Sequence, residues 1–420
     1  MKLKPTVFTS SFVFLLISSF MTIPLKSQPL SLTKDEMIQY TPLWQGERFP
    51  DGRPKVPDDI IKRMRYVTIT EAWELVRRGA TVNTSGARRG AAGGGVNIIR
   101  GGTPGATVSG VTPMGGVATT TIIDAPATNG TGMRRGAPGA AMGGAGMRGG
   151  APGAAAGMGM RSGGAGMMRG GMGGGGGSYD NQYVGNMKPM HTDVTICGRA
   201  MTAQFMPLRP DINQVISQQG RVDGRSAGQY TWGIDMLQQG DVYVANVCEA
   251  ILDASHVGDN LGTSIYHHSG NGAIIWGTLR DLEGNKEIEG FNVFVRDFRP
   301  QSNESNMMMG LNCPLQLGYV TVMPGDVVLA KEMGIVFIPP HLAESVVIES
   351  ERTRLRDTFA HIGVMEGRFT AQQADGNFTP QMNQQFTQWL KDNVENMEKF
   401  FDDPNAAPSK EFIQQYIDQR

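Results

Sequence analysis

The stretch HVGDNLGTSIYHHSGNGAIIWGTLRD, residues 256–281, combines a predicted short helix with a predicted buried strand. The helix is expected over residues 260–268, where glycines at 270 and 272 should end it. The apolar, β-prone run AIIWG that follows predicts a strand buried on both faces. Upstream, DVYVANV (residues 241–247) predicts another strand. The order strand, short helix, strand predicts a right-handed parallel crossover and therefore an α/β domain.

Further strands are predicted on both sides of this crossover. They are expected near residues 194–205, at 291–298, at 315–322 and at 326–340, the last being two strands joined through Met333 and Gly334. Pro324 and Gly325 occupy positions that favour a type II turn. Several β-prone runs thus accompany the crossover, as one α/β sheet requires.

The crossover predicts a functional crevice. Parallel neighbouring strands have their carboxyl ends at the same edge of a sheet, and we expect the two strands to end near Val247 and Gly277. The first turn of the helix and the Arg280–Asp281 dipeptide should then face the same space. The free amides of Gly258, Asp259, Asn260 and Leu261 would hold a carboxylate or a phosphate there.

The side chains at this crevice suit chemistry on a small keto acid. Arg280 offers a planar fork for a carboxylate, and Asp281 offers a hard oxygen ligand for Mg²⁺ or Mn²⁺ held mostly through water. Asp259 could orient a metal-bound water or move a proton. This set fits a reaction that passes through an enolate. The alternative is that Arg280 and Asp281 form a solvent-exposed ion pair or a cap on the turn.

Other polar candidates are weaker. His267 and His268 are adjacent and point to different faces of the helix, and no histidine pair has zinc spacing. His256 could line the crevice or lie in a surface loop. The chain has three widely spaced cysteines, which predict buried free thiols and no disulfide framework: Cys197, Cys248 and Cys313.

The two ends of the chain differ in character. Lys2 and Lys4 precede an apolar run over residues 7–20, which predicts a secretory signal and export to the periplasm or beyond. An uncleaved anchor is the alternative. Near the other end, Thr379 and Pro380 predict the start of a helix with an apolar stripe, and a second helix should begin near Ser409. We expect the stripe to dock on the chain's own core, the alternative being a partner groove.

Residues 85–178 are rich in Gly, Ala, Met and Arg and are expected to be disordered, since they have little apolar surface to bury. They contain eight arginines, no lysine and one acid, Asp124. Weak contact with an anionic surface is one hypothesis for this segment, and an inert insertion is the other. The whole chain has a net charge of −1, which gives no indication of nucleic-acid binding.

The runs VGDNLGTSIYHHSGNGAIIWGTLRD, FNVFVRDFRP, NCPLQLGYVTVMPGDVV and GIVFIPP resemble the RraA-like family. This family comprises regulators of ribonuclease E activity, 4-hydroxy-4-methyl-2-oxoglutarate aldolases and proteins once labelled dimethylmenaquinone methyltransferases. The resemblance implies an α-β-β-α swivelling-domain fold in a homotrimer or a hexamer. It also implies a pyruvate aldolase that uses Mg²⁺ or Mn²⁺ and decarboxylates oxaloacetate.

Carried over to this sequence, the resemblance implies a role for each residue of the crevice. The backbone of Gly258, Asp259, Asn260 and Leu261, with the Arg280 side chain, would bind the keto acid. Asp281 would hold the metal, and Asp259 would serve the water that transfers a proton. A neighbouring subunit would add an acid, with three candidates: Glu349, Glu351 and Asp357.

The sequence departs from the family at two positions. Asp297 replaces a usual glycine near the expected entrance, and Lys331 stands where an acid is frequent. The expected organisation is a signal peptide (1–28), an N-terminal segment of the RraA-like domain (29–84), the insertion (85–178), the RraA-like α/β domain (179–367) and a helical extension (368–420). The favoured function is a lyase for a small 2-oxo acid. The alternatives are a non-catalytic ring that binds a protein partner and a scaffold that displays the insertion.

Overall fold

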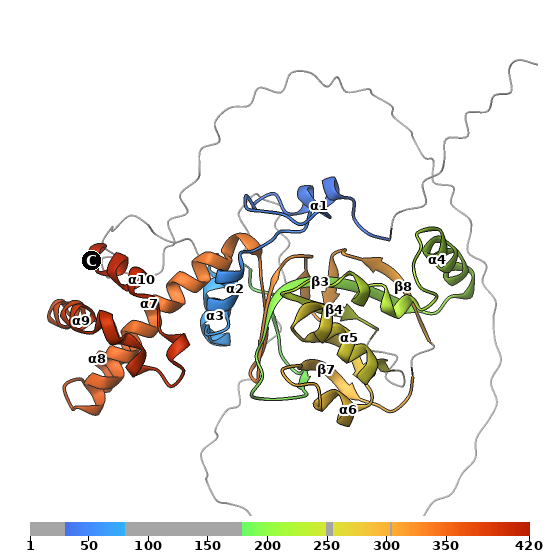
Figure 1. Ribbon diagram of the computed structural model, residues 1–420. Helices are drawn as coiled ribbons and strands as arrows, with labels where there is room; N and C mark the ends of the chain where they lie inside the picture. The colour runs from blue at the N-terminus through green and yellow to red at the C-terminus, as the bar shows by residue number, and fades with distance from the viewer. Residues whose placement is uncertain (1–29, 80–178, 249–254, 303–304) are drawn as a thin grey trace, which may run out of the picture. The chain divides into compact units, whose positions relative to one another are not determined.

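The computed structural model describes residues 30–79, 179–248, 255–302 and 305–420 (Figure 1). The predicted signal segment (1–28) and the whole of the predicted insertion (85–178) lie outside these residues. The described helices are α1 (Lys34–Tyr40), α2 (Asp58–Met64), α3 (Ile69–Arg77), α4 (Pro210–Val222), α5 (Asp259–Ser269), α6 (Leu282–Lys286), α7 (Pro340–Met365), α8 (Ala371–Asp375), α9 (Pro380–Asn393) and α10 (Lys410–Asp418).

The strands form a mixed sheet and a separate hairpin. In the sheet the order is β1-β12-β11-β3-β4-β6-β7-β2, with β5 beside β6 and β8 beside β3. The strands are β1 (Tyr183–Val184), β2 (Lys188–Pro189), β3 (Ile196–Pro207), β4 (Asp241–Asn246), β5 (Ser255–Val257), β6 (Ala273–Leu279), β7 (Val293–Phe298), β8 (Asn306–Leu311), β9 (Leu315–Leu317), β10 (Val320–Val322), β11 (Val327–Lys331) and β12 (Gly334–Ile338). The predicted α/β class is confirmed.

The central crossover forms as the sequence predicts. Strands β3, β4, β6 and β7 are parallel neighbours, and α5 connects β4 to β6. Gly270 ends α5 with a left-handed conformation (φ 62°), which a glycine adopts without strain. One boundary was wrong: β6 continues past Gly277 to Leu279, across a register shift between Ile275 and Thr278. Arg280 therefore follows the strand directly.

Two other predictions need correction. Residues 315–322 are not one strand, because β9 and β10 form an antiparallel hairpin that reverses at Gly318 (φ 60°) and Tyr319. The chain also does not run as a simple loop from β4 to α5. Strand β5 lies between them and pairs with the end of β6, Val257 opposite Leu279.

Alternating side chains of the sheet form hydrophobic cores on its two faces. On one face, Ile275 of β6 and Val293 of β7 pack with Ile265 of α5. On the same strand β6, Ile274 packs with the β9–β10 hairpin through Leu317. A further cluster joins β11 and β12 to α2, α3 and the first half of α7. Helix α5 thus has a rigid base from which its N-terminus meets the edge of the sheet.

The C-terminal helices form their own core with the second half of α7 (Figure 1). Thr379 caps α9 through its hydroxyl group and α10 begins after Ser409, both as predicted, and the Ser409 hydroxyl group also caps α10. Phe386, Leu390 and Met397 of the predicted apolar stripe are buried in this core. Among the described residues, no helix combines the length and the apolar character needed to cross a bilayer.

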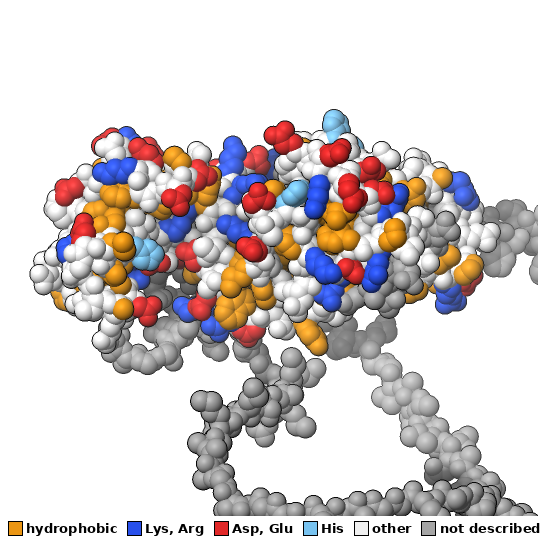
Figure 2. All heavy atoms as spheres, turned by 90° about the horizontal axis from the view of Figure 1, so that it is seen from below, with side chains coloured by type: hydrophobic (Ala, Val, Ile, Leu, Met, Phe, Trp, Pro, Cys, Tyr) orange, Lys and Arg blue, Asp and Glu red, His pale blue; other side chains and the backbone are white. Residues whose placement is uncertain are grey.

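Figure 2 shows one face of the molecule, where acidic and basic side chains are interspersed and hydrophobic side chains form only small patches. This mixture agrees with the net charge of −1 for the whole chain. The pictured face therefore has no broad basic surface of the kind that binds nucleic-acid backbones.

Candidate functional site

The site begins with the short strand β5, which aligns two loops that are distant in sequence. The backbone N–H of Arg280 donates to the carbonyl of Val257 over 3.0 Å. The next residue after Val257 is Gly258, the N-cap of α5. Pairing between β5 and β6 therefore brings the start of α5 next to the Arg280–Asp281 dipeptide.

Gly258 lies in direct contact with the charged pair. A Cβ atom at Gly258 would lie 2.5 Å from Asp281 Oδ2 and 3.0 Å from both Cζ and Nη2 of Arg280. Its backbone is extended (φ −107°, ψ −176°), so glycine is needed here for space and not for conformation. The helix opening and the pair thus face the same few ångströms of space.

The charged pair is accessible to solvent. Arg280 Nη1 lies 2.6 Å from Asp281 Oδ2, and the two side chains are 39% and 37% exposed. Asp281 is in the left-handed region (φ 53°, ψ 49°) and caps α6. Such an exposed contact contributes little to stability, about 0–1 kcal/mol. Both groups are paired with each other but are accessible to a small ligand from solution.

The first turn of α5 presents backbone donors beside this pair. Gly258 is the N-cap and has no side chain to cap α5, although Asp259 Oδ1 accepts the N–H of Asn260 over 2.8 Å. The Asn260 side chain is exposed, and Leu261 packs against the hydrophobic core. The Asn260 N–H is thus engaged with Asp259, whereas the Asp259 and Leu261 N–H groups of the same turn have no acceptor within the helix and could bind a carboxylate.

Asp259 is the first residue of α5, and its side chain faces Gly284 of α6. A Cβ atom at Gly284 of α6 would lie 2.7 Å from Asp259 Oδ2. The Asp259 carboxylate is half-buried and has one oxygen engaged with its own helix. Its second oxygen is the group that could orient a water molecule.

The donor set at the crevice fits a hydrated Mg²⁺ or Mn²⁺ ion. Within the described part of the chain, no three His, Cys, Asp or Glu side chains are grouped as a metal cage. Asp281 supplies one accessible carboxylate, and Mg²⁺ in proteins keeps several waters beside one or two carboxylates and its substrate. Asp281 is therefore a suitable single protein ligand for such an ion.

Asp297, the departure near the entrance, is already neutralised. Lys188 Nζ lies 2.6 Å from Asp297 Oδ1, and Arg299 Nη2 lies 3.0 Å from Oδ2. The hydrogen bond from Lys188 is the main cause that lowers the pKa of this carboxyl. Asp297 is opposite Thr278 in the β6–β7 ladder, so this ion cluster flanks the strand end that carries Arg280.

His256 neither lines the crevice nor lies in a surface loop. It is on β5, 4% exposed, and its Nε2 lies 3.0 Å from Tyr243 Oη. Burial lowers the pKa of this imidazole to about 4, so the ring is neutral at pH 7. Both sequence interpretations of His256 were wrong, because nothing in the sequence indicated the strand that buries it.

The three acids of α7 have partners within their own chain. Arg63 binds both oxygens of Glu351, Nε to Oε1 at 2.8 Å and Nη2 to Oε2 at 2.6 Å, and Glu351 is only 3% exposed. Glu349 pairs with Arg352 at 2.9 Å. Asp357 lies 3.4 Å from Arg356, and burial raises the pKa of its carboxyl. Glu351 thus joins α2 to α7.

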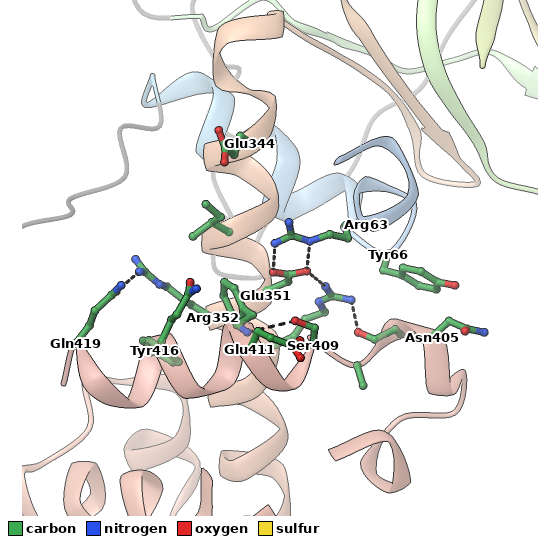
Figure 3. Close-up of a pocket in the computed structure, with 16 residues that line it drawn as sticks. Arg63, Tyr66, Glu344, Glu351, Arg352, Asn405, Ser409, Glu411, Tyr416 and Gln419 are labelled. Carbon is green, nitrogen blue, oxygen red and sulfur yellow. Dashed lines mark hydrogen bonds and ion pairs between the residues drawn. The ribbon is translucent and has the colours of Figure 1, made fainter. Parts of the chain in front are cut away.

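A cavity of about 480 Å³ lies beside α7 and α10, and none of its lining residues belongs to the crevice. Figure 3 shows the Arg63–Glu351 pair at its wall. Arg354 Nη2 lies 4.0 Å from Oε1 of the same carboxylate. Arg354 also donates to the Ala406 carbonyl over 2.8 Å. Arg63, Glu351 and Arg354 thus bind one another and the backbone at this cavity, away from the Arg280–Asp281 pair.

Sequence reasoning missed Asn285. It is fully buried on α6, and its Nδ2 donates to the carbonyl oxygens of both Arg280 and Asp281 over 3.0 Å. An asparagine four residues after Asp281 gives no sequence signal, because α6 is too short for a clear apolar period. Only the fold shows that this side chain reaches back to the charged pair.

Comparison with known proteins gives one family. A family model described as RraA-like: Aldolase/RraA matches residues 174–337. Protein DlpA of Legionella pneumophila subsp. pneumophila is 24% identical over 183 residues, 43% of this chain. The match spans only 28% of that protein's length.

Solved RraA structures are similar to part of the chain. RraAS2 of Streptomyces coelicolor, described as an unusual member of the RNase ES inhibitor RraA family, has 21% identity and a TM-score of 0.37, covering 44% of this chain and 84% of its own. The RNA-processing inhibitor RraA from Thermus thermophilis has 18% identity and a TM-score of 0.29, covering 38% and 86%.

Proposed function

Because residues 174–337 match a family model described as RraA-like, we propose that the chain is a divalent-metal-dependent lyase acting on a small 2-oxo acid. Oxaloacetate and 4-hydroxy-4-methyl-2-oxoglutarate are the proposed substrates, and pyruvate is the product. The observation that carries this proposal is the contact between Gly258 and the charged pair, with Asp281 Oδ2 only 2.5 Å from a Cβ position there. One small acid and one cation would therefore bind on the solvent side of this contact, within reach of the helix start and of the pair.

Substrate binding would use the backbone and Arg280. The amides that open α5, from Gly258 to Leu261, would donate to the substrate carboxylate. The Arg280 guanidinium would bind the keto-acid oxygens at two points. Because these donors are fixed by α5 and β6, they would need little rearrangement to stabilise charge as it forms on the oxygen.

Asp281 would hold the Mg²⁺ or Mn²⁺ ion, which when bound stabilises negative charge on the 2-oxo oxygen as a Lewis acid. In decarboxylation, the C3–C4 bond of oxaloacetate breaks, CO₂ leaves, and the electron pair forms the pyruvate enolate. A water oriented by Asp259 would then protonate C3. In aldol cleavage the same water would first accept the proton of the 4-hydroxyl group. The C3–C4 bond then breaks, C4 becomes the carbonyl carbon of the second product, and the electron pair forms the pyruvate enolate.

The assembly and the compartment belong to the same proposal. We expect a homotrimer or a hexamer in which a neighbouring subunit completes the site, and we expect the protein to be exported. The runner-up function is a non-catalytic RraA-like ring that binds a protein partner. One observation favours it: Arg280 and Asp281 bind each other at 2.6 Å and so already satisfy their charges.

Oxaloacetate turnover tests the proposal. Purified full-length protein is incubated with oxaloacetate and Mg²⁺ or Mn²⁺, and pyruvate is followed above the metal-only rate. We expect Arg280→Ala and Asp281→Asn each to lower kcat/KM by about 100-fold or more. Glu283→Gln is the matched control, an exposed acid in the first turn of α6. Equal rates in all variants, or no turnover of any 2-oxo acid by the wild type, would favour the binding ring.

A further inference from the structure

We infer that Asn285 is a positioning residue that holds the Arg280–Asp281 pair against the N-terminus of α5. The inference rests on the function proposed above. Asn285 is fully buried in α6, and α6 packs against α5. It would not touch the substrate or the metal, and it would act only through the backbone of the two residues that do.

Asn285 makes three hydrogen bonds to the backbone of the pair. Asn285 Nδ2 donates to the carbonyl of Arg280 and to the carbonyl of Asp281, each over 3.0 Å. The Asn285 backbone N–H also donates to the Asp281 carbonyl over 3.0 Å. Since both targets are acceptors, the amide group has only one orientation that fits, with its nitrogen toward the pair.

Asp281 needs such support because its backbone is in the left-handed region, at φ 53° and ψ 49°. Residues with a Cβ atom adopt this conformation in only a few per cent of cases, Asp and Asn more readily than others, so hydrogen bonds to the neighbouring carbonyls help to hold it. The reversal at Asp281 is also what leaves its Oδ2 next to Gly258. Loss of the Asn285 donors would therefore release the conformation that faces the carboxylate toward α5.

Stability alone does not explain the amide at this position. Asn285 Oδ1 is buried and has no hydrogen-bond partner among the described residues. A buried unpaired carbonyl oxygen destabilises the fold, and an apolar side chain of similar size would avoid that loss. What an apolar side chain would not supply is the Nδ2 donor to Arg280 and Asp281. We therefore assign the Asn285 amide to fixing the backbone of Arg280 and Asp281.

Gly262 of α5 provides the space for this amide. A Cβ atom at Gly262 would lie 2.0 Å from Asn285 Oδ1 and 3.1 Å from a ring carbon of Phe291. Gly262→Ala should therefore displace Asn285 without changing any group of the crevice. Because Asn285→Ala removes the atom that clashes, adding Gly262→Ala to that variant should have little further effect.

The test compares Asn285→Leu, Asn285→Ala, Gly262→Ala and the Gly262→Ala/Asn285→Ala double variant in the full-length protein. The first readout is the Mn²⁺ dissociation constant, taken from the free-ion resonance in electron paramagnetic spectra. The second is the Asp281 backbone conformation in a crystal structure of Asn285→Leu. Asn271→Leu is the matched control, because Asn271 is also a buried asparagine that binds a backbone carbonyl, Cys197 at 2.7 Å, but near the other end of α5.

We expect Asn285→Leu, Asn285→Ala and Gly262→Ala to weaken Mn²⁺ binding by about 10–100-fold and to lower kcat more than they raise KM. The double variant should match Asn285→Ala, and Asn271→Leu should bind Mn²⁺ within about twofold of the wild type. Unchanged Mn²⁺ affinity in folded Asn285→Leu, or an Asp281 that keeps its left-handed conformation there, would overturn the inference. Should Asn285→Leu not fold, Gly262→Ala supplies both readouts. A wild type that binds no Mn²⁺ would instead refute the proposed function, and the Asp281 conformation would still decide the role of Asn285.

Discussion

At the scale of single residues, glycines determine which side chains meet at the crevice. Gly258 permits contact between the start of α5 and the Arg280–Asp281 pair, and Gly262 permits the entry of Asn285. The charged pair and the glycines around it were visible in the sequence. Asn285 and the buried state of His256 were not, because both depend on contacts between segments that no local pattern describes.

Gly258→Ala should damage the crevice while sparing the fold. Its extended backbone suits alanine, but the new Cβ would displace the ends of Arg280 and Asp281. We expect kcat/KM for oxaloacetate to fall about 10–100-fold with little change in Tm. Gly228→Ala is the control, since its Cβ would meet only the ring of the exposed Tyr230. Wild-type turnover in Gly258→Ala would place the reaction elsewhere.

His256 should make the protein sensitive to mild acid. Its pKa is about 4 in the folded state and near 6.5 in the unfolded chain, so the unfolded state binds the extra proton between these values. The His256 contribution to stability is complete above pH 6.5 and declines toward pH 4, by about 3 kcal/mol in all. Urea unfolding of His256→Phe should lack this part of the pH dependence.

His267→Gln serves as the control for that series, because His267 is exposed on α5. Its stability should follow the wild type across the whole pH range. If His256→Phe and the wild type lost stability in parallel between pH 6.5 and pH 4, another group would be responsible.

At the scale of elements, the sequence predicted the strand–helix–strand crossover, but it did not predict where β6 ends or that β5 precedes α5. The apolar run of β6 and the glycines after α5 fixed the element types. Strand β5 has only three residues, too few for a pattern, yet it sets the register between Val257 and Leu279 that forms the crevice. The β9–β10 hairpin was merged into one strand because its turn, Gly318–Tyr319, has only two residues.

The Arg63–Glu351 pair should hold α2 against α7. Glu351 is buried and bound at both oxygens, so Glu351→Gln leaves Arg63 without its anion. Because Arg63 is 35% exposed and partly hydrated, we expect a loss of about 2 kcal/mol in the free energy of unfolding. Urea denaturation measures this loss. Glu349→Gln, which removes a more exposed carboxylate two residues earlier on α7, should change stability by less than about 0.5 kcal/mol. Equal effects of the two changes would contradict the assigned role of the pair.

At the scale of the whole molecule, the α/β class and the similarity of residues 174–337 to the RraA-like family model could be predicted from the sequence, whereas the long helix α7 could not. It spans 26 residues and carries two faces, one for the core near the sheet and one for the C-terminal helices. Two different partners give no single apolar stripe. The C-terminal helices were predictable because each keeps one buried face and a hydroxyl cap.

The insertion at 85–178 should affect surface binding and not catalysis. Its eight arginines and single acid give it a net positive charge. Deletion of residues 85–178 is expected to abolish salt-sensitive retention on anionic lipid vesicles, and oxaloacetate turnover should stay within about twofold. Retention that is unchanged by the deletion would show that the arginines do not mediate it.

The central claim is that one space holds both a metal ion and a small acid. The most direct measurement is a crystal structure of the full-length protein with Mn²⁺ and oxalate, a mimic of the pyruvate enolate, in which anomalous scattering locates the metal. The account predicts a manganese peak at the Asp281 carboxylate, with oxalate between it, Arg280 and the amides that open α5. A manganese peak at another carboxylate, or oxalate bound away from Arg280, would contradict it.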